Sequence, residues 1–172
     1  MHAGKAISPP KVLLQVNCII QADMPENMFI SIVYGVMDLD TNAITLAIPG
    51  HEPAIVWRGA CGKPELIRSS TLALGLDAGE LFGETLLEHR LALGEKDILV
   101  LYTDGITEAV DQQDEEFGRD RFIEAVRSSA VGTLAEMMRS VRNGLDVHCA
   151  QRDSSDDRTI LLLRRWKLSG PR

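Results

Sequence analysis

Short apolar runs separated by turn residues recur along the chain. The clearest is 98–102, which follows Lys96-Asp97 and stops at Asp104-Gly105, a pattern typical of a buried β-strand. The same reasoning predicts further strands at 28–38, 44–48, 54–57, 65–68, 85–93 and 159–166. Segment 28–38 is apolar at successive positions, so we expect both of its faces to be buried between layers.

Helical periodicity marks three other segments. Ser8-Pro9-Pro10 is a typical helix start and precedes one apolar face, formed by Val12, Leu13, Val16, Ile19 and Ile20. A second helix is predicted over about 119–129. Thr133 is placed to cap a third helix, in which Leu134, Met137, Met138, Val141 and Leu145 share a face. Strands, then two helices, then a closing strand predict an α+β layered fold.

Composition narrows the classes of function. A chain of 172 residues, 45% of them hydrophobic, is long enough for one domain with a real core. Its net charge of −7 argues against a nucleic-acid or anionic-membrane partner. The apolar runs are too short for membrane insertion, so we expect a cytoplasmic protein. Cys18, Cys61 and Cys149 are far apart and fit reduced thiols.

Two acidic clusters lie next to predicted strands. Asp104 follows the strand at 98–102, and Gly105 beside it lets another group approach the backbone. Asp156-Asp157 precedes the closing strand. If the two strands are neighbours, both clusters fall on one edge of the same sheet, where crowded carboxylates attract a divalent cation. Taken alone, each cluster is better explained as a solvated turn or loop.

Five short sequence motifs, in this order along the chain, resemble those of a known family. They are Met28-Phe29-Ile30-Ser31 through Gly35-Val36-Met37-Asp38; Pro49-Gly50-His51-Glu52-Pro53; Tyr102-Thr103-Asp104-Gly105-Ile106-Thr107-Glu108-Ala109; Glu116-Phe117-Gly118; and Asp156-Asp157-Arg158-Thr159. The resemblance is to the metal-dependent serine/threonine phosphatases of the PPM (PP2C-like) superfamily, in its bacterial SpoIIE/RsbU-type branch. It covers roughly 8–164 and implies a layered sandwich of antiparallel β-sheets flanked by helices.

The resemblance also implies a chemistry. In such phosphatases two Mn²⁺ or Mg²⁺ ions activate a water that attacks phosphoserine or phosphothreonine. Asp104 and Asp156 match metal ligands, and no catalytic residue is expected beyond the ligands. Gly105, Asp157 and His51 are candidates for positioning the site or its loops. Asp157 is equally well interpreted as solvated, and for His51 fixing a loop is favoured over donating to a phosphate.

The start of the chain departs from the family pattern. The family carries two bridging aspartates on early strands, whereas residues 1–27 contain only Asp23, at the end of a helix. We therefore interpret residues 1–172 as a single PPM-type domain, truncated at its N-terminus or degenerate, with an incomplete two-metal site. Open sheet edges are expected where the N-terminal strands are missing.

Two functional hypotheses follow. The first is dephosphorylation of a phosphorylated anti-sigma-factor antagonist in bacterial partner switching. The second is a non-catalytic, phosphatase-like module that binds a signalling protein. Control by an upstream sensor or receiver domain is a further expectation by analogy with the family.

Overall fold

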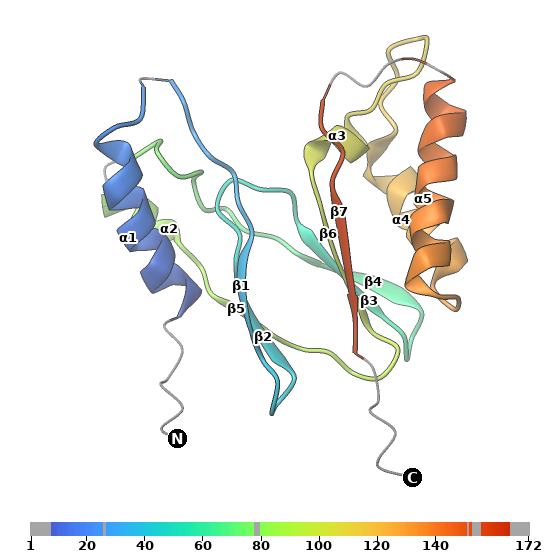
Figure 1. Cartoon of the computed structure of the whole chain (residues 1–172), viewed down its shortest axis with the longest axis horizontal. Coiled ribbons are helices and arrows are strands. Elements are labelled where there is room, and N and C mark those ends of the chain that lie inside the picture. Colours follow the sequence, from blue (N-terminus) through green and yellow to red (C-terminus); the bar gives the residue numbers. More distant parts are fainter. Residues whose placement is uncertain (1–7, 26, 78–79, 151, 153–155, 166–172) are drawn as a thin grey trace. The chain divides into compact units, whose positions relative to one another are not determined.

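The part of the chain that the structure describes forms two β-sheets, each with its own helices (Figure 1). The computed structural model describes residues 8–25, 27–77, 80–150, 152 and 156–165. It divides the chain into two compact units, one of residues 1–53 and 67–93 and the other of residues 54–66 and 94–172. Within the described ranges, no helix is both long and apolar enough to cross a bilayer.

In its described residues, the first unit has a three-stranded antiparallel sheet and two helices. Its sheet order is β1 (Tyr34–Asp38), β2 (Ala43–Ala47) and β5 (His89–Ala92), with β2 in the centre. The helices are α1 (Pro9–Gln21) and α2 (Glu80–Thr85). Their buried contacts with the sheet and the loop before α2 come from Leu13, Ala47, Leu74 and Phe82.

Two predicted strands of this unit are wrong in extent. The strand expected at 28–38 begins only at Tyr34, and residues 28–30 are exposed apart from an isolated bridge between Ile30 and Leu74. As an edge strand, β1 pairs only with β2, and none of its residues is fully buried. The strand expected at 85–93 is instead the end of α2 followed by β5.

Helix α1 begins where predicted but buries a different face. Leu13 and Asn17 point into the unit, while Val16 and Ile19 are 36% and 69% exposed. Asn17 is fully buried, and its polar groups are satisfied there because its amide donates to the Asp77 carbonyl at 3.0 Å and accepts from Gly75 N–H at 2.8 Å. This bridge to the loop before α2 rotates the apolar stripe of α1 partly toward solvent.

The second unit has a four-stranded sheet in the order β4 (Lys63–Ile67), β3 (Ala54–Arg58), β6 (Ile98–Tyr102) and β7 (Ile160–Arg164). Strand β6 pairs antiparallel with both β3 and β7. The strand expected at 65–68 begins earlier, at Lys63, and Trp166 of the predicted closing strand lies outside the described residues. The α+β prediction with antiparallel strands is confirmed.

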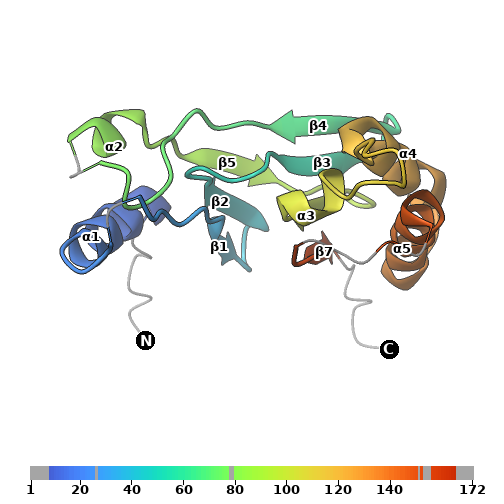
Figure 2. The ribbon, with the colours of Figure 1, turned by 90° about the horizontal axis from the view of Figure 1, so that it is seen from above.

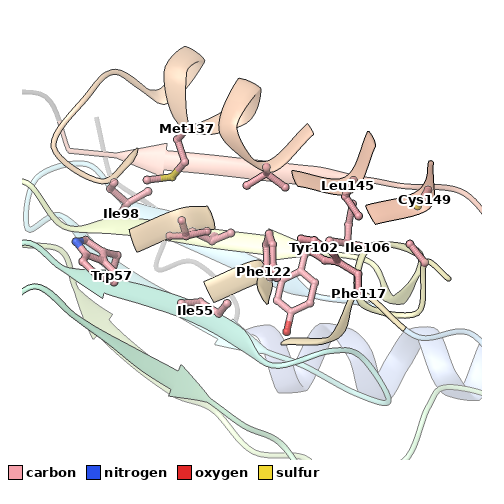
Figure 3. Packing of buried hydrophobic residues seen from close by; sticks show 14 residues of the cluster. Ile55, Trp57, Ile98, Tyr102, Ile106, Phe117, Phe122, Met137, Leu145 and Cys149 are labelled. Carbon is pink, nitrogen blue, oxygen red and sulfur yellow. The ribbon is translucent and has the colours of Figure 1, made fainter. Parts of the chain in front are cut away.

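Helices α4 (Gly118–Ser129) and α5 (Leu134–Cys149) lie side by side in this unit (Figure 2). Figure 3 shows their buried residues facing the strands, among them Phe122, Met137 and Leu145. The predicted cap of α5 is confirmed: Thr133 Oγ1 accepts from Glu136 N–H at 3.1 Å, and the Glu136 carboxylate accepts from Thr133 N–H at 2.6 Å. This packing holds β6 firmly from one side.

One buried carboxylate fixes the turn that leads into β6. Asp97, only 6% exposed, accepts hydrogen bonds from Arg58 Nη1 at 2.8 Å, Gly59 N–H at 2.9 Å and Gly94 N–H at 3.1 Å. Burial by itself raises the pKa of Asp97, but these three donors outweigh it and hold the pKa below its ordinary value.

We expect Asp97→Asn to lower the free energy of unfolding by about 2 kcal/mol at pH 7, because Arg58 and two amides lose a charged acceptor. A carboxylate with a lowered folded-state pKa stabilises the fold above its unfolded-state pKa, and this stability is lost as the pH falls through the folded-state value. In urea unfolding, the midpoints of the wild-type chain and of the variant should therefore approach each other as the pH is lowered. Equal midpoints at pH 7 would contradict this role.

Candidate metal centre

Asp104 and Asp156-Asp157 lie at the same end of one sheet. Strands β6 and β7 are neighbours, with Tyr102 opposite Ile160. Asp104 follows β6 as the first residue of the short helix α3 (Asp104–Thr107), and Asp156-Asp157 lies just before β7. Figure 1 shows α3 at the end of β6 next to the start of β7. The expectation that the two acidic clusters share a sheet edge is confirmed.

Thr103 ties the two acidic segments together. Its N–H donates to the Thr159 carbonyl at 3.1 Å, and its hydroxyl accepts from Thr159 N–H at 2.9 Å. The same hydroxyl donates to the Asp157 carbonyl at 3.0 Å. These three bonds continue the β6–β7 pairing beyond the last paired residues, so Asp104 and Asp156 are held in a fixed register.

Gly105 allows the closest approach between these segments. A Cβ atom at this position would lie 2.5 Å from the carbonyl oxygen of Asp157 and 3.5 Å from Cβ of Asp156. The first distance is far shorter than a van der Waals contact, so only glycine fits without movement of the backbone. The absence of a side chain at Gly105 thus sets how near Asp156 comes to α3.

The two expected ligands have similar local geometry. Asp104 Oδ1 accepts from Gly105 N–H at 2.9 Å, and Asp156 Oδ1 accepts from Asp157 N–H at 2.7 Å. Each carboxylate is exposed and is oriented by the amide that follows it. Asp157 is also exposed, but its carbonyl oxygen is held by Thr103, so its main chain takes part in the edge. Carboxylate oxygens on a rigid edge suit Mg²⁺ or Mn²⁺.

These residues fit part of a metal site. Among the described residues, no group of three or more His, Cys, Asp or Glu side chains is arranged to hold a metal ion. Two carboxylates still suffice as the protein's share of a Mg²⁺ shell when waters and a phosphate complete it. Whether the metal site is complete stays a prediction.

His51 belongs to the first unit, in the turn after β2. Its Nδ1 lies 3.4 Å from the Glu52 carbonyl oxygen, and the adjoining Gly50 N–H donates to the Thr71 carbonyl at 3.0 Å. Both contacts stay within the turn and its neighbouring loop. The loop-fixing interpretation of His51 stays a prediction.

The sequence pattern assigned no role to Thr103, and an Asp-Gly turn was one of its two interpretations at the place where α3 is formed. A threonine directly before an Asp-Gly pair is a typical N-cap residue, which was the available signal for a helix start. Thr103 does occupy the N-cap position, but its hydroxyl makes no capping bond and bonds Asp157 and Thr159 instead. That use of the hydroxyl depends on residues more than fifty positions away.

Thr103→Val should lower the free energy of unfolding by about 1 kcal/mol, because the bonds to Asp157 and Thr159 lose the hydroxyl while the shape is kept. Thr103→Ser keeps the hydroxyl and should remain close to the wild type. Thermal melts of the three proteins give the comparison. A valine variant as stable as the serine variant would show that the hydroxyl does not tie the edge.

Comparisons with known proteins agree on one family. The family described as Stage II sporulation protein E (SpoIIE) matches residues 2–166. Phosphoserine phosphatase RsbU of Bacillus subtilis (strain 168) is 24% identical over 159 residues, which is 92% of this chain and 46% of RsbU. The chain thus spans less than half the length of that relative.

Solved structures show the same fold. The SiaA-PP2C domain of Pseudomonas aeruginosa superposes with a TM-score of 0.78 at 17% identity, covering 92% of this chain and 61% of that one. A structure of the PP2C phosphatase domain of Bacillus subtilis SpoIIE with a fragment of its regulatory domain gives 0.74 at 17% identity, covering 93% and 45%. These likenesses confirm the predicted PP2C-like fold.

Proposed function

The chain belongs to the SpoIIE family, and on that premise we propose that it is part of a metal-dependent protein serine/threonine phosphatase domain. The observation that carries the proposal is the shared edge of β6 and β7. There Asp104 and Asp156 follow and precede neighbouring strands, and Thr103 and Gly105 set their spacing.

Asp104 and Asp156 would hold Mn²⁺ or Mg²⁺ on this edge, since both offer exposed carboxylate oxygens in fixed orientations. When bound, a metal pair supplies an activated water and neutralises charge on the phosphoryl group. The described residues of this chain contribute by positioning the two carboxylates. The amides of Gly105 and Asp157 orient the carboxylates, and Thr103 keeps the two segments in register.

We propose that the remaining ligands come from residues outside this sequence, as the family pattern of early aspartates implies. Residues 1–172 would then be one piece of a single PPM-type domain whose N-terminal strands complete the site. The proposed substrate is a phosphoserine or phosphothreonine protein of the anti-sigma-factor antagonist type, in the cytoplasm. RsbU, described as a phosphoserine phosphatase, supports this choice.

The test is phosphate release from a phosphoserine peptide with and without millimolar Mn²⁺. The chain as given and a protein extended by the upstream segment of its reading frame are assayed side by side, with EDTA as the control. We expect weak or no release by the first and Mn²⁺-dependent release by the second. If neither protein releases phosphate, the phosphatase proposal is rejected in favour of a non-catalytic module that binds a signalling protein.

A further inference from the structure

A pocket of about 380 Å³ lies in the second unit, among α3, α5 and β7. Four apolar residues line it: Ile106, Met138, Leu145 and Ile160. Three charged residues share the lining: Arg142, Asp146 and Arg158. Its volume is within the range of small ligand-binding sites, and it combines an apolar wall with a few polar groups, as such sites do.

The pocket borders the candidate metal centre. Ile106 lies two residues after Asp104, and Arg158 lies two residues after Asp156. Both stretches are fixed by contacts already described, because Gly105 packs against Asp157 and Thr103 bonds Thr159. A chain segment that reaches the carboxylate edge therefore has this pocket next to it.

Among the described residues that line the pocket, cationic side chains outnumber anionic ones. Two arginines and one aspartate are among its described lining residues, although the whole chain has a net charge of −7. Arg142 is exposed and makes no ion pair or hydrogen bond through its side chain with another described residue. A local cationic pair of this kind attracts an anionic group and disfavours a neutral or cationic one.

Arg158 has hydrogen-bonding capacity that the described residues leave unused. Its Nη2 donates to the Cys149 sulfur at 3.5 Å, and sulfur is a weak acceptor. Its Nε is buried and has no acceptor among the described residues. A buried donor without an acceptor costs free energy. A ligand that supplies the acceptor for this guanidinium therefore gains more binding free energy here than at an exposed arginine.

We propose that this pocket binds a glutamate side chain of the protein substrate, close in sequence to its phosphoserine. The inference rests on the proposed phosphatase function. The carboxylate lies between Arg142 and Arg158, and the methylene stem packs on Ile106, Leu145 and Ile160. The pocket thereby selects substrates by a residue that is not itself dephosphorylated.

The test uses fluorescent phosphoserine peptides with an alanine and leucine background. Each peptide carries a single glutamate, at one of the positions from four before to four after the phosphoserine. A control peptide has glutamine in place of that glutamate. Binding is measured by fluorescence anisotropy without metal, so the result does not depend on turnover. For at least one position we expect the glutamate peptide to bind about tenfold more tightly than its glutamine control, as a charged hydrogen-bonded pair implies.

Variants of α5 assign the effect to the pocket. Arg142→Ala should remove the preference for glutamate, and Arg142→Glu should replace it with a preference for a lysine peptide. Arg139→Ala is the matched control, because Arg139 is an exposed arginine on the same helix that does not line the pocket. It should keep the preference. Melting curves check that each variant is folded.

Equal binding of glutamate and glutamine peptides at every position would overturn the pocket proposal, as would a preference that survives Arg142→Ala. Phosphate release is read separately. A glutamate preference without Mn²⁺-dependent release in the extended protein keeps the pocket as a binding site and removes the phosphatase function. Mn²⁺-dependent release without a glutamate preference keeps the phosphatase function and removes the pocket as a binding site.

Discussion

Gly105→Ala is expected to lower the free energy of unfolding by about 2–3 kcal/mol, a typical cost of forcing an extra carbon into a packed site. The new Cβ would lie 2.5 Å from the carbonyl oxygen of Asp157, and that carbonyl is already held by Thr103. The backbone before β7 must move away, so the distance between Asp104 and Asp156 changes too. Urea unfolding measures the stability, and a Mn²⁺ titration measures the site.

Gly144→Ala is the matched control for this prediction. Gly144 lies within α5 of the same unit, and a Cβ there would make only an ordinary contact with Phe117 at 3.5 Å. Alanine in a helix interior is favoured over glycine, so this variant should be more stable by about 0.5–1 kcal/mol. If both variants behave alike, the close approach at Gly105 does not constrain the edge.

Asp104→Asn is expected to reduce Mn²⁺-dependent phosphate release in the extended protein on the order of 100-fold or more, since even residues that merely support a metal ligand cost 10- to 100-fold. Stability should change little, because the side chain is exposed. The amide can still accept from Gly105 N–H, so the loss would reflect charge and not shape.

Asp40→Asn provides the control for loss of one negative charge. Asp40 is exposed in the turn between β1 and β2, away from any proposed ligand in sequence. It should retain the wild-type rate. Unchanged turnover in Asp104→Asn, measured beside this control, would remove Asp104 from the mechanism.

Local patterns in the sequence predicted the second unit well. Strand β6 is a run of five apolar or aromatic residues between turn residues, and it is buried along most of its length. Helices α4 and α5 follow the apolar period, and the Thr133–Glu136 pair forms the expected cap. These features depend on neighbours within a few residues, which a sequence displays directly.

Features that depend on distant partners were not predictable in the same way. The orientation of α1 around Asn17 is set by a loop about sixty residues away. Residues 28–30 are exposed, and Ile30 forms an isolated bridge with the distant Leu74. Helix α2 was missed because it is short and its only fully buried residue is Phe82. At the site, the aspartates could be chosen by resemblance, but the roles of Thr103 and of the Asp157 carbonyl appear only once β6 and β7 are paired.

In the proposed site, Asp104 and Asp156 bind one metal centre together. Electron paramagnetic resonance of Mn²⁺ tests it directly, because binding removes the signal of the free hexaaquo ion even when affinity is weak. We expect loss of the free-ion signal with the wild-type chain and with Asp40→Asn, and much weaker binding by both Asp104→Asn and Asp156→Asn. Mn²⁺ binding that is the same in all four proteins would contradict it.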